Sequence, residues 1–224
     1  RVIAIIPAKG TSQRLPGKNM AMLGGHHLIE WTVCDAINSD IITDIYVSTD
    51  CEKIAGVVEN MPKVTVVKRP PELCQAHSPS ESAVTHFLSS IDYEPDIIVL
   101  LQCTSPFRYP DQLDRSISLF IEDDSADSMF YGSDIGRWIW NPTTLNPVNY
   151  QLNERPMTQN KEWELIECGD YVFTNDIFKK TGNRLGGIKT VYRVGKLATF
   201  DIDEPMDLEI CRAIVSAVHF DARK

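Results

Sequence analysis

The 224-residue sequence predicts an α/β protein with a mostly parallel sheet that is covered by helices on both faces. Short β-branched runs alternate with helical patterns through the first half of the chain, as in proteins built from strand, helix and strand units. The segment Asp96–Gln102 contains five consecutive apolar residues, which is typical of a strand buried on both faces. The first apolar run ends at a loop rich in Lys, Arg, Gly and Pro, as strands do at the binding edge of an open sheet.

Hydrophobic periodicity predicts the elements of the first half. Ile3–Pro7 is apolar and β-branched, and it predicts the first strand. Leu28–Asn38 repeats apolar residues at helical spacing and predicts the first helix. The same two periods predict a strand at Ile45–Ser48, a helix at Glu52–Glu59, a strand at Val64–Val67, a helix from Ser80 or Ser82 to Ile91, and the buried strand Asp96–Gln102.

The second half contains an irregular segment between regular elements. Residues 134–167 hold three of the four Trp and five Asn without a sustained period, which predicts an inserted arm that packs on a partner subunit or roofs a pocket. A long structural loop is the equally weighted alternative. Around this segment we expect a helix from about Pro110, strands at Ser128–Tyr131, Gly169–Phe173 and Thr190–Val194, a helix at Asp176–Thr181, and a final helix at Pro205–Phe220.

Length and composition predict one globular domain over residues 1–224, and the composition also excludes several functional classes. The formal net charge of -9 argues against non-specific binding to nucleic acid, which needs a basic surface. The six Cys are scattered singly, without the C-x-x-C spacing of a zinc site or a compact disulfide framework. No apolar run approaches the length needed to span a bilayer. We therefore expect a single-domain cytoplasmic protein that binds neither nucleic acid nor membrane.

The loop Ala8–Asn19, A-K-G-T-S-Q-R-L-P-G-K-N, carries the clearest chemical signal. It brings Lys9, Arg14 and Lys18 to the end of the first strand, where backbone N–H groups of small residues can also face an anion. The loop matches neither the P-loop nor the dinucleotide-binding fingerprint. Three cations at one strand end predict a triphosphate site, and the alternative is a basic surface turn.

Three further polar segments follow predicted strands. They are V-S-T-D at Val47–Asp50, K-R-P-P-E-L at Lys68–Leu73 with H-S-P-S-E-S after it, and L-Q-C-T-S-P-F-R at Leu101–Arg108. Together with the first loop, and with F-D-I-D-E-P-M-D-L-E near the end of the chain, they resemble in order the motifs of the acylneuraminate cytidylyltransferase family. The resemblance covers nearly the whole chain. Its specific parts are Ala8–Asn19 and Gln102–Pro106, because V-S-T-D is short enough to arise by chance.

This resemblance implies a three-layer, Rossmann-like fold of the nucleotide-diphospho-sugar transferase type, with the arm serving dimerisation. It also implies a reaction in which the anomeric hydroxyl of an acidic nonulosonic sugar, such as N-acetylneuraminate, attacks the α-phosphate of CTP and releases pyrophosphate. Positioning and charge neutralisation would supply most of the rate enhancement, so no nucleophilic side chain is needed. The implied partners are CTP, the acidic sugar and a second copy of the chain.

The resemblance also implies the nucleotide-binding residues. Lys9, Ser12, Lys18 and Asn19 would face the nucleotide, while Arg69 and Ser82 would bracket the cytosine. Lys9 and Lys18 would also be catalytic, because they stabilise charge on the phosphates. The full nucleotide-binding set comprises Ala8, Lys9, Gly10, Ser12, Arg14, Lys18, Asn19, Arg69, Ser80 and Ser82.

Asp201 and Asp203 form the candidate metal site and complete the catalytic set. They are two residues apart in the strand-like run K-L-A-T-F-D-I-D, so their side chains should share a face. Mg²⁺ is commonly held by one or two carboxylates, with waters and substrate phosphates as its other ligands. The alternative is that Asp203 caps the final helix, because Glu204 and Pro205 follow it. We expect Asp201 to bind metal and Asp203 to serve either or both roles.

The acceptor-binding residues are predicted on the other side of the site. The resemblance implies that Gln102, Thr104 and Ser105 hydrogen-bond the sugar, with Gly169 and Asp170 near them. A cation from the second half would pair with the sugar carboxylate, and Arg155 is preferred over Lys161 because an Arg can bind a carboxylate through two hydrogen bonds.

The sequence departs from the family pattern at three places. The usual Arg of the first loop is Lys9, which keeps the charge but loses bidentate phosphate geometry. The usual Asn-Gly before the late strand is Cys168-Gly169, followed by the carboxylate of Asp170. The piece Arg14–Lys18, R-L-P-G-K, is closer to the synthetases that activate the eight-carbon acid Kdo. The alternatives are thus a synthetase for Kdo, another acid or a phosphonate, and a silent nucleotide-binding homologue.

Overall fold

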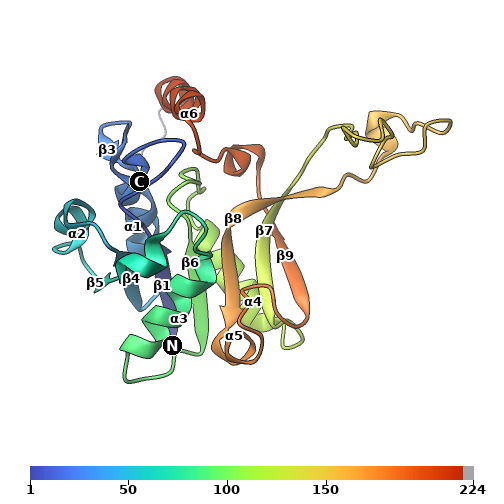
Figure 1. Ribbon diagram of the computed structural model, residues 1–224. Coiled ribbons are helices and arrows are strands. Elements are labelled where there is room, and N and C mark those ends of the chain that lie inside the picture. The colour runs from blue at the N-terminus through green and yellow to red at the C-terminus, as the bar shows by residue number, and fades with distance from the viewer. Residues whose placement is uncertain (219–224) are drawn as a thin grey trace.

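A computed structural model describes residues 1–218 of the chain. Its main sheet has seven strands in the order β5-β4-β1-β6-β8-β7-β9 (Figure 1). Strand β8 is antiparallel to both of its neighbours, and the other neighbouring strands of this sheet pair in parallel. The strands are β1 (Val2–Pro7), β4 (Asp44–Thr49), β5 (Val64–Lys68), β6 (Ile97–Leu101), β7 (Ser128–Asp134), β8 (Leu165–Thr174) and β9 (Lys189–Arg193). The predicted mostly parallel sheet is confirmed.

Six α-helices surround this sheet in the described part of the chain. They are α1 (Leu28–Asn38), α2 (Glu52–Val58), α3 (Ser80–Ser90), α4 (Gln112–Glu122), α5 (Asn175–Thr181) and α6 (Pro205–Val218). Each corresponds to a helix that the sequence predicts, with ends shifted by one or two residues. The predicted end of the last helix, Phe220, lies outside the described residues.

The core divides into two layers because side chains alternate along each strand. Ala4 and Ile6 of β1 face the cluster that contains buried side chains of α1, α2, α4 and α6. Ile3 and Ile5 face the other cluster, which contains buried side chains of α3 and α5. Each of these four β1 residues is 0% exposed. The predicted covering of both sheet faces by helices is therefore confirmed, and β1 is an interior strand of the sheet, between β4 and β6.

Short elements complete the fold at points where the sequence has no long period. A two-stranded antiparallel sheet forms from β2 (Met22–Leu23) and β3 (His26–His27), directly before α1. No sequence pattern predicts this hairpin, because strands of two residues are too short to show alternating apolar and polar side chains. The short 3-10 helices are η1 (Lys18–Met20), η2 (Pro71–Cys74), η3 (Thr158–Asn160) and η4 (Lys196–Thr199).

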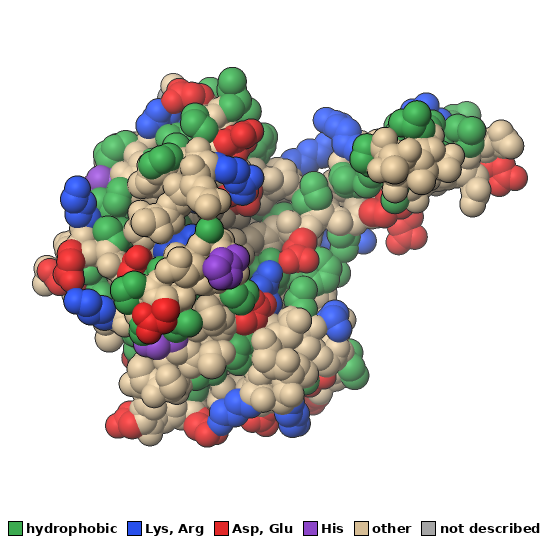
Figure 2. All heavy atoms as spheres, viewed as in Figure 1, with side chains coloured by type: hydrophobic (Ala, Val, Ile, Leu, Met, Phe, Trp, Pro, Cys, Tyr) green, Lys and Arg blue, Asp and Glu red, His purple; other side chains and the backbone are tan. Residues whose placement is uncertain are grey.

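The irregular segment 134–167 forms an arm that extends away from the sheet (Figures 1 and 2). Its base is regular, because β7 continues to Asp134 and β8 begins at Leu165, and these two residues pair. The predicted strand Gly169–Phe173 is thus too short at its start. Between the two strands, an isolated bridge joins Trp140 to Pro147. In residues 1–218, no helix has the length and apolarity needed to cross a membrane.

Candidate active site

The loops that carry the predicted motifs meet at one edge of the sheet. Strand β1 lies between β4 and β6, so the first loop, the segment after β4 and the segment after β6 leave neighbouring parallel strands at the same edge. This is the edge at which open α/β sheets bind ligands. The sheet order therefore brings together motifs that lie far apart in the sequence.

The first loop is held by hydrogen bonds to its neighbours. The amide of Ala8 continues the sheet by donating to the Ser48 carbonyl at 2.9 Å, and the amide of Gly10 donates to Oδ1 of Asp50 at 2.7 Å. Buried Asn19 donates from Nδ2 to the Lys9 carbonyl at 2.9 Å. Gly17 has a φ of 68°, a left-handed conformation that favours glycine, immediately before η1. These contacts fix the backbone while leaving the loop cations at the surface of the site.

The cations of this loop meet the end of the chain. Nζ of Lys18 lies 2.9 Å from Oδ1 of Asp203, and a guanidinium nitrogen of Arg14 lies 2.5 Å from its Oδ2. Nζ of Lys9 donates to the Gln75 carbonyl at 3.2 Å. The first loop and Asp203 therefore lie together although 185 residues separate Lys18 from Asp203.

A pocket of about 760 Å³ lies beside these cations. Its volume is within the range of ordinary small-molecule sites. The lining residues are Lys9, Thr11, Ser12, Gln13, Arg14, Lys18, Asp50, Pro71, Cys74, Gln75, Ala76 and Asp203. Five of them were predicted from the sequence: Lys9, Ser12, Arg14, Lys18 and Asp203. The pocket thus combines three cations with two carboxylates, a donor set suited to a polyphosphate that arrives with a divalent cation.

Other residues of the predicted nucleotide set do not line this pocket. Arg69 is only 5% exposed and donates to the Ser48 carbonyl at 2.6 Å, while its Nε has no hydrogen-bond partner. Ser80 and Ser82 lie in the first turn of α3, where the Ser82 hydroxyl donates to the Pro79 carbonyl at 2.7 Å. Ala8, Gly10 and Asn19 hold the first loop, so in this structure their contacts are to the protein backbone and to Asp50.

The Asp201 and Asp203 carboxylates differ in their electrostatic environment. Loss of water around its carboxyl raises the pKa of Asp201, although the residue as a whole remains exposed, and the charge of Asp203 acts in the same direction. Desolvation also acts to raise the pKa of Asp203, but the hydrogen bond and charge of Lys18, together with Arg14, outweigh it and lower that pKa. Asp203 is therefore the more firmly ionised of the two.

The segment around these carboxylates is not a regular strand. The run predicted to be strand-like contains η4 and then irregular backbone, although buried Ile202 separates two residues with more exposed side chains. Asp207 accepts hydrogen bonds from the amides of Asp203 and Glu204, both at 2.9 Å. Asp207, in the first turn of α6, thus supplies one half of a capping box, and the side chain of Asp203 is left to pair with the first loop.

The donor set tests whether a metal ion suits this place. Among residues 1–218, no three His, Cys, Asp or Glu side chains are grouped as ligands for a metal ion. Asp201 and Asp203 alone supply two carboxylates, which is enough for Mg²⁺ when phosphates and waters complete the octahedron. The residues therefore fit a metal that binds with its nucleotide rather than a preformed metal centre.

The predicted acceptor residues lie on the turn that follows β6. The Thr104 hydroxyl is within 3.5 Å of Oε1 of Gln102, and the Thr104 carbonyl accepts from the Ile202 amide at 2.8 Å. Gly169 of β8 allows this turn to approach, because a Cβ built on Gly169 would meet the Ser105 hydroxyl oxygen at 2.3 Å. Four of the predicted acceptor residues are thus brought together by β6 and β8.

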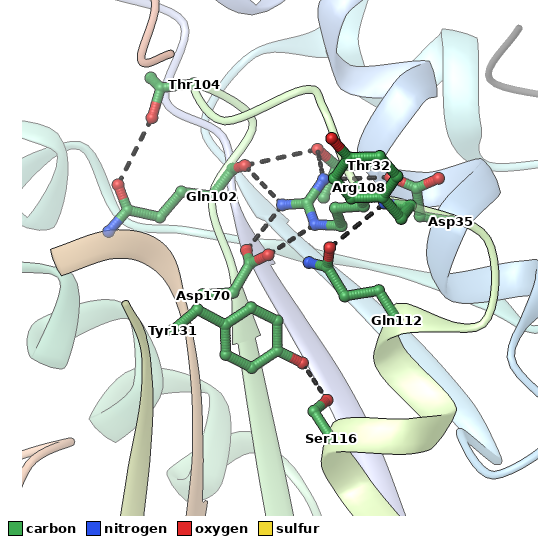
Figure 3. A network of polar contacts seen from close by, with 10 residues as sticks. Thr32, Asp35, Gln102, Thr104, Arg108, Gln112, Ser116, Tyr131 and Asp170 are labelled. Atoms are coloured by element: carbon green, nitrogen blue, oxygen red, sulfur yellow. Dashed lines mark hydrogen bonds and ion pairs between the residues drawn. The ribbon is translucent and has the colours of Figure 1, made fainter. Parts of the chain in front are cut away.

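Asp170 lies beside the turn that carries the predicted acceptor residues, and its carboxylate is buried. It is 3% exposed, and its two carboxylate oxygens accept from Nε and a terminal nitrogen of Arg108, both at 2.7 Å (Figure 3). Asp170 lies at the point of β8 where the register against β7 shifts, between the pairs Phe130–Tyr171 and Tyr131–Cys168. Both of its carboxylate oxygens bind Arg108 in this structure, and its role in acceptor binding stays a prediction.

The two candidate cations for the sugar carboxylate lie on the arm. The guanidinium of Arg155 lies 4.6 Å from the ring centroid of Trp138 and 5.5 Å from that of Tyr150. Nζ of Lys161 lies 5.2 Å from the ring of Trp163 and 3.0 Å from a carboxylate oxygen of Glu164. Within one copy of the chain, Arg155 and Lys161 thus contact the aromatic residues of the arm and not the residues that line the pocket.

Sequence reasoning missed residues whose importance depends on folding. Asp50, the last residue of V-S-T-D, was not predicted as a site residue, yet it accepts a hydrogen bond from the first loop and lines the pocket. Arg108, the last residue of L-Q-C-T-S-P-F-R, was not predicted either, yet it is 4% exposed and forms the centre of a buried ionic network. No local pattern marked Arg108, because its segment contains several polar residues and its partners Asp35 and Asp170 lie far away in the sequence.

Comparison with known proteins places these features in a family. The family model described as "Cytidylyltransferase" matches residues 3–213. N-acylneuraminate cytidylyltransferase A of Danio rerio is 32% identical over 212 residues, which are 92% of this chain and 49% of that protein. CMP-N,N'-diacetyllegionaminic acid synthase of Legionella pneumophila is 35% identical over 122 residues, which are 53% of each chain. This chain spans about half the length of these curated relatives.

Solved structures agree on the fold. CMP:2-keto-3-deoxy-manno-octonic acid synthetase, solved in complex with CTP, superposes with a TM-score of 0.71 over 96% of this chain and 98% of that chain, at 16% identity. A 4-diphosphocytidyl-2C-methyl-D-erythritol synthase from Anaerococcus prevotii gives a TM-score of 0.70 over 96% of both chains, at 13% identity. Identities this low show the fold alone. Because the family model matches residues 3–213, nearly the whole chain, this protein belongs to the cytidylyltransferase family.

Proposed function

We propose that this protein transfers CMP from CTP to an acidic nonulosonic sugar of the N-acetylneuraminate type and releases pyrophosphate. The observation that carries the proposal is the contact of Lys18 and Arg14 with Asp203 at a pocket of about 760 Å³. The turn that carries Gln102 adjoins this site and is bonded to the same C-terminal segment. Relatives named for acylneuraminate and diacetyllegionaminate support the substrate class.

In this reaction the anomeric hydroxyl oxygen of the sugar forms a bond to the α-phosphorus of CTP. The bond between that phosphorus and the bridging oxygen of the β-phosphate breaks, pyrophosphate leaves with the bonding electrons, and the hydroxyl proton passes to solvent. Lys9, Arg14 and Lys18 would stabilise negative charge on the phosphates, while Gln102 and Ser105 would orient the acceptor. The protein therefore acts by positioning and electrostatics.

Mg²⁺ is the cofactor that we propose for this reaction. Asp201 and Asp203 would hold it, and when bound it would neutralise charge on the triphosphate. The phosphates would compete with Asp203 for Lys18 and Arg14, because both cations pair with the Asp203 carboxylate in this structure. Asp203, with its lowered pKa, is then released in ionised form at neutral pH.

A panel of acceptors with CTP tests the substrate class. N-acetylneuraminate, legionaminate-type acids and Kdo are compared, and pyrophosphate release and CMP-sugar formation are both measured. Preference for nine-carbon acids is the expected result. Preference for Kdo would favour the alternative that the R-L-P-G-K piece raises, and no product with any acid would reject the proposed reaction in favour of a phosphonate synthetase or a silent homologue.

We further propose that the protein acts as a cytoplasmic homodimer in which the arm contacts the second copy. Leu145, Val148, Leu152 and Met157 of the arm are all more than 60% exposed, which is unusual for four apolar side chains in one short segment. Arg155 would then have the opportunity to reach the acceptor site of the partner. Light scattering should give the mass of a dimer, and a variant that replaces these four residues by Ser should give a monomer. A monomeric parent protein would reject this proposal.

A further inference from the structure

A buried network centred on Arg108 lies beneath the turn that carries Gln102 (Figure 3). The Arg108 side chain is 2% exposed and forms a bidentate ion pair with Asp170. A second terminal nitrogen lies 3.2 Å from both Asp35 and the hydroxyl of Thr32, on α1. The network therefore joins α1 to β8 through one guanidinium.

Apolar side chains of similar volume could fill the space that this network occupies in the core. Ion pairs removed from water gain little net stability, because desolvation of the charges opposes their attraction. Breaking such a pair by removing one member is nevertheless strongly destabilising, because the other charge is left unpaired. Because its ion pairs contribute little net stability, the buried guanidinium of Arg108 is better explained by the geometry that it imposes on its neighbours.

The neighbour on which Arg108 acts is the main chain of Gln102. A terminal guanidinium nitrogen of Arg108 donates to the Gln102 carbonyl at 3.0 Å, and the Thr32 hydroxyl donates to the same carbonyl at 3.4 Å. Figure 3 shows this carbonyl directed toward Arg108 while the Gln102 side chain points away from it. Because these two hydrogen bonds fix the carbonyl, the side-chain amide of Gln102 lies on the opposite side of the turn.

The same turn is bonded to the candidate metal segment. The Thr104 carbonyl accepts from the Ile202 amide at 2.8 Å, and Ile202 stands between Asp201 and Asp203. The Thr104 hydroxyl lies near Oε1 of Gln102 and is also a hydrogen-bond partner of Asp201. A shift of the turn would therefore move Gln102 and the two carboxylates together.

We infer that Arg108 is a positioning residue of the reaction: fixed by Asp170, its guanidinium holds the turn 102–105 so that Gln102 meets the acceptor while Asp201 and Asp203 stay aligned with the phosphates. This inference rests on the proposed function. Arg108 touches neither substrate. It acts on the acceptor side and on the metal side, whereas the first loop, where the nucleotide would bind, is held in place by hydrogen bonds that do not involve Arg108.

Two variants separate positioning from stability. Arg108→Lys keeps the charge but loses the planar group that bonds Asp170 through two nitrogens. The double variant Arg108→Met with Asp170→Leu removes the bidentate pair, and should fold because apolar replacement of a buried ion pair is often neutral or stabilising. The third member, Asp35, loses its cation and should take up a proton, because burial already raises its pKa to about 7. Arg115→Lys is the matched control, since the Arg115 side chain is 70% exposed and pairs only with Asp111 on the surface.

The measurements are the KM of the acceptor, kcat with Mg²⁺, the Kd of CTP in the presence of a chelator, and the urea midpoint. Both Arg108 variants should raise the acceptor KM about tenfold or more and lower kcat, because small displacements of positioning groups have large effects on rate. The Kd of CTP should change less than about twofold, since Arg108 acts on the acceptor and metal sides. Arg115→Lys should match the wild type.

Wild-type kinetics in a stable double variant would overturn the inference. Equal losses of acceptor binding and CTP binding in Arg108→Lys would also overturn it, because they indicate a general structural role. A wild-type protein that forms no CMP-sugar from any acidic acceptor would instead reject the proposed function, so the two failures are distinguishable.

Discussion

Asp203 connects the two ends of the chain through its contacts with Lys18 and Arg14. A carboxylate paired with two cations is stabilised in its ionised form, which agrees with its lowered pKa. The same cations are the groups that a triphosphate needs, so nucleotide binding would exchange one anion for another without leaving a cation unpaired. At the residue scale, the site is prepared for a ligand that carries several negative charges.

Lys18→Ala tests this exchange. Hydrogen bonds to charged groups contribute about 1.5–3 kcal/mol, so the variant should bind CTP about tenfold to a hundredfold more weakly. The KM of the acceptor should change much less, because Gln102 and Ser105 lie on a different strand end. Calorimetry with CTP and steady-state kinetics with varied acceptor give the two numbers. Equal losses on both sides would place the phosphate site elsewhere.

Asp35 should give a pH dependence to folding stability. Burial raises its pKa from 3.8 to about 7, although Arg108 acts in the opposite direction. A carboxyl whose pKa is higher in the folded state contributes stability that is complete below pH 4 and is lost as pH rises toward 7. The stability advantage of the wild type over Asp35→Asn should therefore decrease between pH 4 and 7. Urea unfolding of both proteins across this range checks it, and a constant difference would contradict the shifted pKa.

At the scale of single elements, the long periodic segments were predictable. Ile3–Pro7, Leu28–Asn38 and Asp96–Gln102 form a strand, a helix and a strand because each buries one stripe or two faces of apolar side chains. The run before Asp201 was predicted as strand-like, but it contains η4. A short segment with few apolar residues takes its conformation from tertiary contacts, here the bond between Ile202 and Thr104.

The start of α6 offers a test at this scale. Asp207 accepts from the amides of Asp203 and Glu204, so Asp207→Ala should lower the free energy of unfolding by about 1 kcal/mol, the typical effect of losing a helix cap. Urea denaturation measures this change. Met206→Ala is a suitable control because Met206 is 65% exposed in the same turn. A stability equal to that of the control would remove Asp207 as the cap.

At the scale of the whole molecule, strand order decides which motifs meet. The chain visits β1, β4, β5 and β6 in sequence, yet β1 and β6 are neighbours and β8 inserts between β6 and β7. This order places the first loop beside the Gln102 turn, and it places Gly169 against Ser105. The site is thus assembled from distant segments by one sheet, with the arm projecting beyond it.

Ligand-dependent stability tests the assembled site. A ligand that binds only the folded protein raises its stability by mass action, by about 2.7 kcal/mol at a concentration one hundred times its Kd. CTP with Mg²⁺ should therefore raise the melting temperature more than ATP, GTP or UTP under the same conditions. Thermal unfolding at matched nucleotide concentrations gives the comparison. An equal shift with all four nucleotides would contradict cytosine selection.

The sequence by itself determined the strands and helices with strong periodicity, the covering of the sheet on both faces, and the cluster of cations in the first loop. These properties depend on local spacing and residue type, which can be read along the chain. Only the tertiary structure decided that Asp170 is buried against Arg108, that Arg155 lies among the aromatic side chains of the arm, and that Asp207 rather than Asp203 caps α6. Such placements depend on strand register and on contacts between residues far apart in sequence, and no local pattern records them.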